Sequence, residues 1–398
     1  MLDNILAFIK KFIPVPVFNL FQPFYHLCLA YLAAAIYGFP ARRLKIVGVT
    51  GTNGKSTVVH LISSILEEAG EKVASVSSLR FRVNQQEEKN TLKMTMPGRF
   101  KLQKFLREAV WAGCKYGIIE ITSEGIKQYR HVGIVFYMAV LTNMTPEHIE
   151  SHGTFEKYRA VKAELFKRAK IHVLNGEDPS IEYFLKIPAQ NRIIYSKKDL
   201  PPNVHLKLLG EFNLENAVAA FHAAKLLGIE FNAIKRALES VRGVPGRLEF
   251  MQKEPFLVVV DYAHTPDALE KVYETLGGNL ICVLGSAGGG RDKWKRPEMG
   301  KIADKFCKKI ILTNEDPYDE NPEAILAEVE CGIAQKNKLQ KILDRSEAIR
   351  EAIKSAKAGD TVIITGKGAE PWIMGPNGAK IPWDDREVVR EELAIAQK

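Results

Sequence analysis

Residues 45–57 read KIVGVTGTNGKST, and residues 58–69 continue as VVHLISSILEEA. The first part begins with a short apolar run that predicts a buried strand, and the second repeats its apolar residues at helical spacing. Between them, small glycines allow backbone N–H groups to approach phosphate oxygens, and the helix N-terminus adds partial positive charge. Lys55 is placed to reach the terminal phosphates of a nucleotide, and Ser56 to ligate Mg²⁺. The stretch therefore predicts the start of an α/β nucleotide-binding domain.

The rest of the chain continues this alternation, which is typical of parallel sheets covered by helices. Gly and Pro cluster in VRGVPGR at residues 241–247, which predicts a hinge. We expect an apolar helical segment at residues 1–43, a central P-loop ATPase domain with a parallel sheet at 44–243, and a smaller Rossmann-like α/β domain at 244–398. Strands are predicted at 45–49, 116–121, 135–141, 172–174, 256–260, 280–284, 309–312 and 361–364, and helices at 56–69, 102–112, 155–169, 213–227, 266–276 and 322–334.

Composition and charge narrow the class of protein. The 398 residues include 46% hydrophobic and 26% charged residues, which excludes disordered and fibrous classes. The formal net charge of +9 favours a polyanionic partner, such as a nucleotide, a phosphorylated substrate or an acidic membrane surface. Nucleic acid is not expected, because no recognised binding motif and no basic stripe with interleaved aromatic residues is present. The five cysteines show neither a CxxC pair nor metal-ligand spacing, which predicts unpaired core cysteines in a reducing cytoplasm.

The N-terminal segment departs from the soluble pattern. Residues 12–41 contain no Asp, Glu, Lys or Arg, and residues 27–37 read LCLAYLAAAIY. This apolar core is shorter than the ~20 residues that a spanning helix needs, and we expect Pro14, Pro16 and Pro23 to interrupt what precedes it. Three interpretations stay open: a helix packed on the next domain, a helix lying in a membrane interface, and a membrane span. The expected location is the cytoplasm, with contact to the inner face of a membrane under the second interpretation.

Candidate metal ligands follow two predicted strands. Residues 118–125 read IIEITSEG, which places Glu120 at the carboxyl end of a strand, where active sites of open α/β sheets gather. Residues 142–166 read TNMTPEHIESHGTFEKYRAVKAELF, which places His148 just before a predicted helix. Phosphoryl transfer from ATP needs Mg²⁺ at the phosphates, because the phosphates otherwise repel other anionic groups that must approach them. We therefore expect Ser56, Glu120 and His148 to ligate metal.

Several motifs, in order along the chain, resemble those of the Mur ligase family. The loop has the family form GTNGK[ST], and residues 142–166 resemble its TN-x3-DH-x3-HG segment, with Glu147 where the family usually has Asp. Within the family, the motifs are most similar to those of the MurE-type UDP-N-acetylmuramoyl-tripeptide synthetases. Further matches are GEFNLEN at 210–216, PGR at 245–247, DYAHTPD at 261–267, GSAGGGRDKWKRPEMG at 285–300, DR at 344–345, GKGAE at 366–370 and DDRE at 384–387.

The resemblance implies a function and a set of site residues. The function is an ATP-dependent carboxylate–amine ligase that adds an amino acid to a peptidoglycan-precursor peptide through an acyl phosphate. ATP and Mg²⁺ are the implied cofactors, and Lys162 is implied to be carbamylated, so that its new carboxylate-like group holds metal. Lys55, Lys162 and His148 are the implied catalytic residues. The implied nucleotide-binding residues are Gly51, Thr52, Asn53, Gly54, Lys55, Ser56, Thr57, Asn216, Arg247, His264, Asp344 and Arg345, and the implied substrate-binding residues are Thr122, Ser123, Glu315, Asp316, Tyr318, Gly366 and Glu370.

One departure from the family concerns the acceptor. MurE-type ligases begin with a domain that binds the UDP part of the substrate, yet only about 45 residues precede the P-loop strand. We therefore expect that domain to be lacking. The alternatives are a Mur-family ligase for a lipid-linked or non-muramyl substrate, and a nucleotide-binding scaffold attached to a membrane.

A second departure concerns the amino acid. Ligases of this type that are specific for meso-diaminopimelate resemble one another in a DNPR segment, whose Arg can pair with the second carboxylate. Residues 313–322 read TNEDPYDENP at this place, so Tyr318 replaces that Arg, and Glu315 and Asp316 precede it. A buried carboxylate without a partner costs several kcal/mol. We therefore expect an incoming amino acid with a side-chain ammonium group, such as lysine or ornithine.

Overall fold

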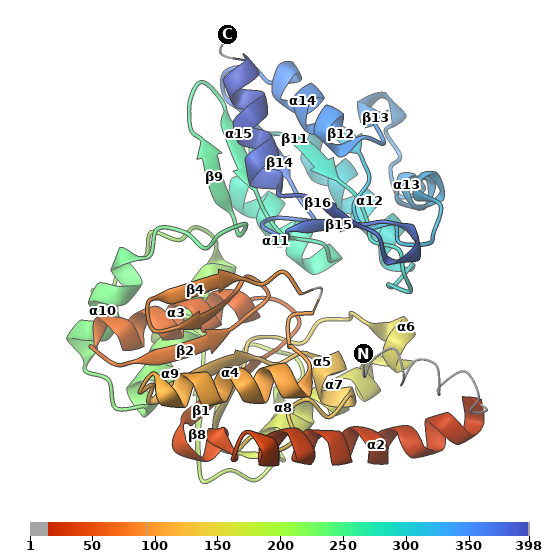
Figure 1. Ribbon diagram of the computed structural model, residues 1–398. Coiled ribbons are helices and arrows are strands. Elements are labelled where there is room, and N and C mark those ends of the chain that lie inside the picture. Colours follow the sequence, from red (N-terminus) through yellow and green to blue (C-terminus); the bar gives the residue numbers. More distant parts are fainter. Residues whose placement is uncertain (1–14, 93, 397–398) are drawn as a thin grey trace.

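The computed structural model describes residues 15–92 and 94–396, without the side chains of residues 15–21, and its two α/β units lie one above the other (Figure 1). The first unit contains an eight-stranded sheet in the order β4-β3-β2-β5-β1-β6-β7-β8. Its strands run parallel except for β3, which is antiparallel to both of its neighbours, β2 and β4. The strands are β1 (Lys45–Thr50), β2 (Val73–Val76), β3 (Arg80–Val83), β4 (Gln86–Lys89), β5 (Tyr116–Glu120), β6 (Phe136–Leu141), β7 (Ala169–Asn175) and β8 (Asn191–Tyr195).

Helices cover both faces of this sheet because neighbouring strand residues point to opposite sides. Val47 belongs to the apolar cluster formed with α3, α9 and α10, while Ile46 belongs to the cluster formed with α4, α7 and α8. Near-continuous apolar strands of this kind are typical of a parallel sheet buried on both faces. The helices are α3 (Lys55–Glu68), α4 (Arg99–Trp111), α5 (Ser123–Lys127), α6 (Ile149–His152), α7 (Phe155–Phe166), α8 (Ile181–Leu185), α9 (Glu211–Leu226) and α10 (Phe231–Ser240), with the 3-10 turn η2 (Lys197–Asp199).

A long helix, α2 (Val15–Ile36), precedes the first strand and packs against α4 (Figure 1). The expected interruption by proline is wrong at Pro23, which lies inside this helix; Pro14 lies outside the described residues. Within the described part of the chain, no helix is long and apolar enough to cross a bilayer. The 3-10 turn η1 (Pro40–Arg43) connects α2 to β1.

The second unit has a six-stranded sheet in the order β13-β12-β11-β14-β10-β9, parallel except for β9. Helices α11, α12 and α13 cover one face, and α14 and α15 cover the other. The elements are β9 (Glu249–Gln252), β10 (Leu257–Val260), α11 (Pro266–Leu276), β11 (Asn279–Leu284), α12 (Lys295–Phe306), β12 (Cys307–Leu312), α13 (Pro322–Glu330), η3 (Lys336–Lys338), β13 (Leu339–Lys341), α14 (Arg345–Ser355), β14 (Asp360–Ile364), β15 (Trp372–Met374), η4 (Pro376–Gly378), β16 (Lys380–Pro382) and α15 (Asp385–Ala396).

The expectation of unpaired core cysteines is wrong at two positions. Cys282 lies on β11 and Cys307 begins the neighbouring strand β12. Both are buried, their Cα atoms lie 6.1 Å apart, and a disulfide joins their sulfurs. The spacing along the chain carried no sign of this pair, because the parallel sheet brings together residues that are 25 positions apart.

Candidate functional site

The phosphate loop connects β1 to α3 through two glycines with positive φ. Gly51 has φ 149° and Gly54 has φ 81°. A Cβ at Gly51 would lie 1.9 Å from Thr142 Oγ1, and a Cβ at Gly54 would lie 2.2 Å from Asn216 Oδ1. Both positions therefore exclude a side chain, and Asn216 of α9 lies directly against the loop.

The loop is braced by the chain that follows β6. The Asn53 backbone N–H donates to Asn143 Oδ1 at 2.9 Å, and Thr142 Oγ1 donates to Asn53 O at 2.6 Å. Thr52 Oγ1 donates to Thr145 O at 3.0 Å. These bonds hold the loop backbone in place before a nucleotide binds, so less conformational entropy is lost on binding.

Lys55 is the first residue of α3, and its ammonium group points back over the loop. Its Nζ donates to Thr52 O at 2.6 Å. Burial lowers the pKa of Lys55, while the nearby carboxylate of Glu120 raises it. Lys55 lines a cavity of about 420 Å³ between the two units, with Thr52, Asn53, Gly54, Ser56, Thr57 and Asn216.

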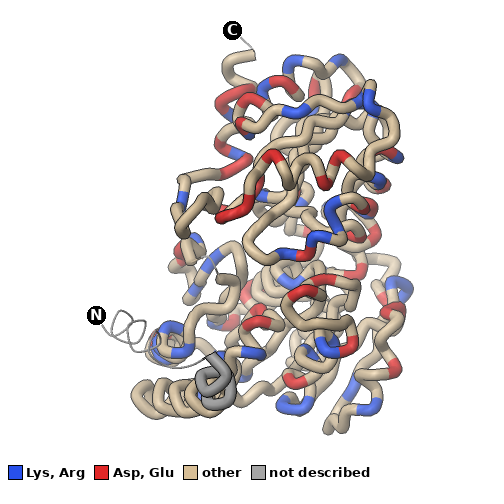
Figure 2. The backbone as a smooth tube through the Cα atoms, turned by 90° about the vertical axis from the view of Figure 1, so that its right-hand side faces the viewer, with Lys and Arg blue, Asp and Glu red and all other residues tan. Residues whose placement is uncertain are grey.

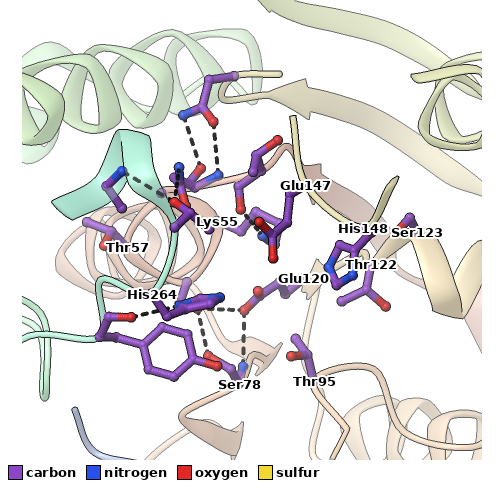
Figure 3. A pocket seen from close by; sticks show the side chains of 18 of the residues that line it. Lys55, Thr57, Ser78, Thr95, Glu120, Thr122, Ser123, Glu147, His148 and His264 are labelled. Carbon is purple, nitrogen blue, oxygen red and sulfur yellow. Dashed lines mark hydrogen bonds between the residues drawn. The ribbon is translucent and has the colours of Figure 1, made fainter. Parts of the chain in front are cut away.

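Glu120, the last residue of β5, lines the cavity next to the end of the phosphate loop. Its Oε2 accepts hydrogen bonds from Ser56 Oγ at 2.7 Å and from the Ser78 backbone N–H at 3.0 Å. Figure 3 shows Glu120, Glu147 and Lys55 turned toward the same space. A carboxylate and a hydroxyl beside a phosphate loop fit Mg²⁺, which prefers one or two carboxylates and completes its shell with phosphates and water.

Lys162, on α7, is buried behind the phosphate loop. Its Nζ donates to Gly51 O at 2.7 Å and contacts Thr50 Oγ1 at 3.5 Å. Burial, and then the charge of Lys55, lower the pKa of Lys162 well below its usual value, while Glu120 opposes the shift. The amine is therefore driven toward its neutral form.

His148 has a left-handed backbone conformation, with φ 59°, directly before the short helix α6. Burial lowers the pKa of His148, and the cations Arg291 and Lys162 lower it further, so the imidazole is neutral. A neutral imidazole has a free nitrogen lone pair for a metal. Among residues 15–92 and 94–396, no three His, Cys, Asp or Glu side chains converge on one point, so this chain would have to complete a metal shell with Ser56, a modified lysine, phosphates or water.

The second unit closes over the cavity through a buried ion pair. Lys295 Nζ, at the start of α12, lies 2.9 Å from Glu147 Oε1, and both side chains are buried. The carboxylate of Asp292 accepts from the backbone N–H groups of Ile149 at 3.1 Å and Glu150 at 2.8 Å. These contacts connect the segment that follows β6 in the first unit to the segment that follows β11 in the second.

Residues before β9 and after β10 line the side of the cavity that belongs to the second unit. Asp261 is buried and accepts from the backbone N–H groups of Leu248 and Ala263, both at 2.6 Å. His264 Nδ1 lies 2.8 Å from Tyr262 O, and burial together with Lys295 lowers its pKa. The Arg247 guanidinium stacks on the Tyr262 ring at 3.9 Å. The family resemblance implied Arg247 and His264 as nucleotide-binding residues, and both line the cavity.

The far end of the cavity contains residues that the sequence reasoning did not single out. Arg130 Nη2 donates to Gln128 Oε1 at 2.6 Å, and both residues line the cavity with Thr95 and Ser123. Burial lowers the pKa of Arg130, which nevertheless keeps a cation at this end. Ser78 was also missed, because its position follows β2, a strand that the pattern did not predict. Thr122 and Ser123 were predicted to contact substrate, and both lie here.

Several predicted residues lie outside this cavity. Arg345 forms a buried ion pair with Asp385, with Nη2 and Oδ2 2.7 Å apart, and Asp344 caps α14 by accepting from the Glu347 backbone N–H. Lys367 contacts both oxygens of Asp316 at 2.9 Å and Glu370 Oε2 at 2.5 Å. The remaining predicted substrate residues, Glu315, Tyr318 and Gly366, belong to the same region of the second unit, where a Cβ at Gly366 would meet Glu315 and where Tyr318 follows Asp316 by two positions.

Two family models match the chain. The Mur ligase middle domain matches residues 49–201. The Mur ligase, glutamate ligase domain, matches residues 246–368. The two matches fall on the two α/β units described above.

Individual proteins are also similar to this chain, and the similarity extends over most of its length. The chain is 38% identical over 389 residues to a UDP-N-acetylmuramoyl-L-alanyl-D-glutamate--2,6-diaminopimelate ligase of Aquifex aeolicus, over 91% of this chain and 80% of the relative. It is 37% identical over 433 residues to a UDP-N-acetylmuramyl-tripeptide synthetase of a Roseiflexus species, over 96% and 84%. A solved UDP-N-acetylmuramoyl-L-alanyl-D-glutamate--2,6-diaminopimelate ligase superposes with a TM-score of 0.59 at 32% identity, over 89% and 79%. A Yersinia pestis folylpolyglutamate synthase/dihydrofolate synthase shares the fold, with a TM-score of 0.71 at 20% identity, over 93% of each chain.

Proposed function

The chain belongs to the Mur ligase family of ATP-dependent amide-forming ligases, and from this premise we propose that it adds an amino acid to the peptide of a peptidoglycan precursor, as the MurE-type ligases do. The observation that carries the proposal is a single cavity that begins at the phosphate loop and ends at Arg130. One end suits the phosphates of ATP, and the other offers a cation to an acidic acceptor. We place the division between the two domains at residues 243 and 244, within the predicted hinge.

In the proposed reaction, an oxygen of the acceptor carboxylate attacks the γ-phosphorus of ATP. The bond to the bridging oxygen breaks, so that ADP leaves and an acyl phosphate forms. The neutral amine of the incoming amino acid then attacks the acyl carbon, the bond to the phosphate oxygen breaks, and the amine loses a proton. Lys55 and Arg291 are the proposed cations beside the transferred phosphoryl group, since this transfer depends mainly on charge stabilisation and positioning.

The proposed metal site consists of Ser56, Glu120, His148 and a carbamylated Lys162. Mg²⁺ bound there would reduce the repulsion between the acceptor carboxylate and the phosphates. The carbamate forms when the neutral Lys162 amine attacks the carbon of CO₂, so that an N–C bond forms and the amine loses a proton. The buried position of Lys162 next to the loop supports this assignment, because an unmodified ammonium group there would repel the metal.

The choice of amino acid rests mainly on Tyr318. The sequence argument counted on the negative charge of Glu315 and Asp316, but Lys367 pairs with Asp316 and neutralises part of that charge. Tyr318 still cannot supply the cation that a second carboxylate requires. Lysine or ornithine is therefore the proposed substrate, although the named relatives include ligases for 2,6-diaminopimelate. A preference for meso-diaminopimelate over lysine and ornithine in amino-acid-dependent phosphate release would refute this part.

The proposal is tested by incubating the protein with ATP, Mg²⁺, a panel of amino acids and two acceptors, one UDP-linked and one lipid-linked. We expect phosphate release that needs both the acceptor and one class of amino acid, and a product whose mass equals their sum less water. The acceptor that reacts decides between the UDP-linked substrate and the lipid-linked alternative. Nucleotide binding without any product would favour the scaffold alternative and refute the ligase.

A further inference from the structure

The outer face of α2 is apolar and open to solvent. It consists of Phe24, Cys28, Tyr31, Leu32 and Ile36, which recur at helical spacing along one side. Phe24 is 65% exposed, Ile36 61%, and Tyr31 and Leu32 50% each. Figure 1 shows α2 along the lower edge of the molecule, with no other labelled element beneath it.

The opposite face of α2 already makes the contacts that the fold needs. Ala30, Ala33 and Ala34 are buried, α2 packs against α4, and Ala34 lies close to the chain at Gly133. A helix on the surface of a soluble protein normally turns charged residues outward. Here the outward residues carry no charge, so the exposed apolar side chains are not explained by folding of this domain.

Basic side chains border this apolar face. The turn η1 adds exposed Arg42 and Arg43 at the C-terminal end of α2, and α4 contributes exposed Lys104. The acid on α4, Glu108, lies 3.6 Å from Lys104 and offsets one of these charges. Figure 2 shows the same contrast, with the tan helix at the base of the molecule next to blue segments. An apolar strip with a cationic border is complementary to an anionic lipid surface.

An exposed tryptophan extends the face at the end of α4. Trp111 is 76% exposed and lies beside Arg107, whose guanidinium donates to Tyr37 O at the end of α2. Tryptophan and tyrosine are favoured at the boundary between lipid and water, because each ring joins an apolar body to a polar group.

We propose that the outer face of α2, together with Trp111, lies in the interface of an anionic lipid bilayer and holds this enzyme at a membrane surface. The helix lies flat there, because its other face stays packed on α4. This gives a specific surface to the membrane contact that the sequence suggested for residues 1–43. It does not depend on which amino acid or acceptor the enzyme uses.

The proposed surface borders the far end of the active-site cavity. Arg99, the first residue of α4, lies 2.6 Å from His26 Nδ1 of α2 and donates to Gln128 O at 2.6 Å. Gln128 in turn lines the cavity with Arg130. If the proposed function holds, a bilayer under α2 therefore lies near the end of the cavity that is assigned to the acceptor.

The test uses the full-length protein and co-sedimentation with two kinds of vesicle, phosphatidylcholine alone and phosphatidylcholine mixed with phosphatidylglycerol. We expect binding to the mixed vesicles that weakens as salt is raised. The double variant Phe24→Glu/Ile36→Glu should lower the partition coefficient by on the order of tenfold or more. Arg42→Glu/Arg43→Glu should weaken binding to the mixed vesicles without changing the weak binding to phosphatidylcholine.

Ile395→Glu on α15 is the matched control, because Ile395 is 57% exposed and lies on the other domain (Figure 1). It should bind vesicles like the wild type, and all variants should keep their circular dichroism spectrum and thermal midpoint. Equal binding by the wild type and Phe24→Glu/Ile36→Glu would overturn the proposal. So would an absence of vesicle binding, or a dimer in sedimentation that Phe24→Glu/Ile36→Glu dissolves, since the face would then join two copies of the chain.

Discussion

Lys162 shows how burial can change the chemistry of one residue. Its amine lies behind the phosphate loop, hydrogen-bonded to Gly51 O, and burial beside Lys55 lowers its pKa. A neutral amine is the form that reacts with CO₂, whereas an exposed lysine stays protonated. The same position therefore disfavours an ammonium group and favours the proposed carbamate.

The first prediction concerns this residue. Lys162→Ala should reduce ATP turnover by on the order of 100-fold or more, because a proposed metal ligand is lost. A small carboxylate such as acetate should restore part of the activity. Lys167→Ala, at the exposed end of the same helix, should leave turnover unchanged. Wild-type turnover in Lys162→Ala would remove this residue from the mechanism.

Arg345 shows where motif matching and structure differ. The motif assigned it to the nucleotide, but its guanidinium is buried against Asp385 and also donates to Thr365 O at 2.8 Å. Removing one partner of a buried ion pair typically costs about 3–5 kcal/mol, because the other charge stays buried without a partner.

The second prediction follows from that pair. Arg345→Met should lower the stability of the second domain by about 3 kcal/mol or more, and leave the KM for ATP unchanged in the folded fraction. Trp383 donates to Asp385 Oδ1 at 2.8 Å, so its fluorescence reports denaturant unfolding at this place. Lys305→Met is the control, because its pair with Glu270 in the same domain lies at the surface. A changed KM for ATP with unchanged stability would restore the nucleotide assignment.

At the scale of elements, the phosphate loop depends on a glycine whose environment allows no side chain. Gly54 combines φ 81° with the close approach of Asn216. Gly70, after α3, has nearly the same φ of 79°, yet among the described residues no atom lies within 4 Å of its added Cβ. Substitutions at these two glycines therefore distinguish the effect of backbone strain from that of a steric clash.

The third prediction uses this contrast. Gly70→Ala should only lower the stability, by about 1–2 kcal/mol, because alanine is less stable than glycine in a left-handed backbone conformation. Gly54→Ala should also displace Asn216 and the loop, and so weaken binding of a nonhydrolysable ATP analogue by on the order of tenfold or more. Scanning calorimetry measures the stability of each variant, and titration calorimetry measures its affinity for the ATP analogue. Similar ATP-analogue affinity in the two variants would show that the loop tolerates the added methyl group.

The elements also show what the sequence could predict. The strand at residues 45–49 and the helix at 56–69 were predicted within one residue of β1 and α3, because buried parallel strands and amphipathic helices have strong patterns. β4 reads QEEK and is fully exposed, so no apolar pattern marked it as a strand. The site was predictable where it follows strong strands, as at Glu120. Arg130 and Ser78 were not, because tertiary packing brings them to the cavity.

At the scale of the whole molecule, the two domains are closed around the cavity. Glu147 and Lys295 pair across the interface, and Asn53 Nδ2 of the loop donates to Asp267 Oδ2 at 3.1 Å. The chain passes between the domains at residues 241–247, where Gly and Pro permit rotation. Opening and closing about this segment would admit ATP and release product.

The fourth prediction tests the closing contact. Lys295→Met leaves the Glu147 carboxylate buried without its partner, so the open form should become more populated. Small-angle X-ray scattering should then give a larger radius of gyration, and protease should cleave faster within residues 241–247. Lys293→Met is the control, because the Lys293 side chain is 55% exposed and its ion pair with Glu320 is long, at 3.6 Å. An unchanged scattering profile would show that this pair does not hold the domains together.

The central claim is that this cavity activates a carboxylate as an acyl phosphate. In that mechanism an oxygen of the acceptor carboxylate leaves with the phosphate when the amine attacks. The most direct measurement is mass spectrometry of the phosphate released from an acceptor whose carboxylate carries heavy oxygen, in unlabelled water. The account predicts one labelled oxygen in each phosphate that accompanies amide formation. Phosphate without label, with the heavy oxygen retained in the acceptor, would contradict it.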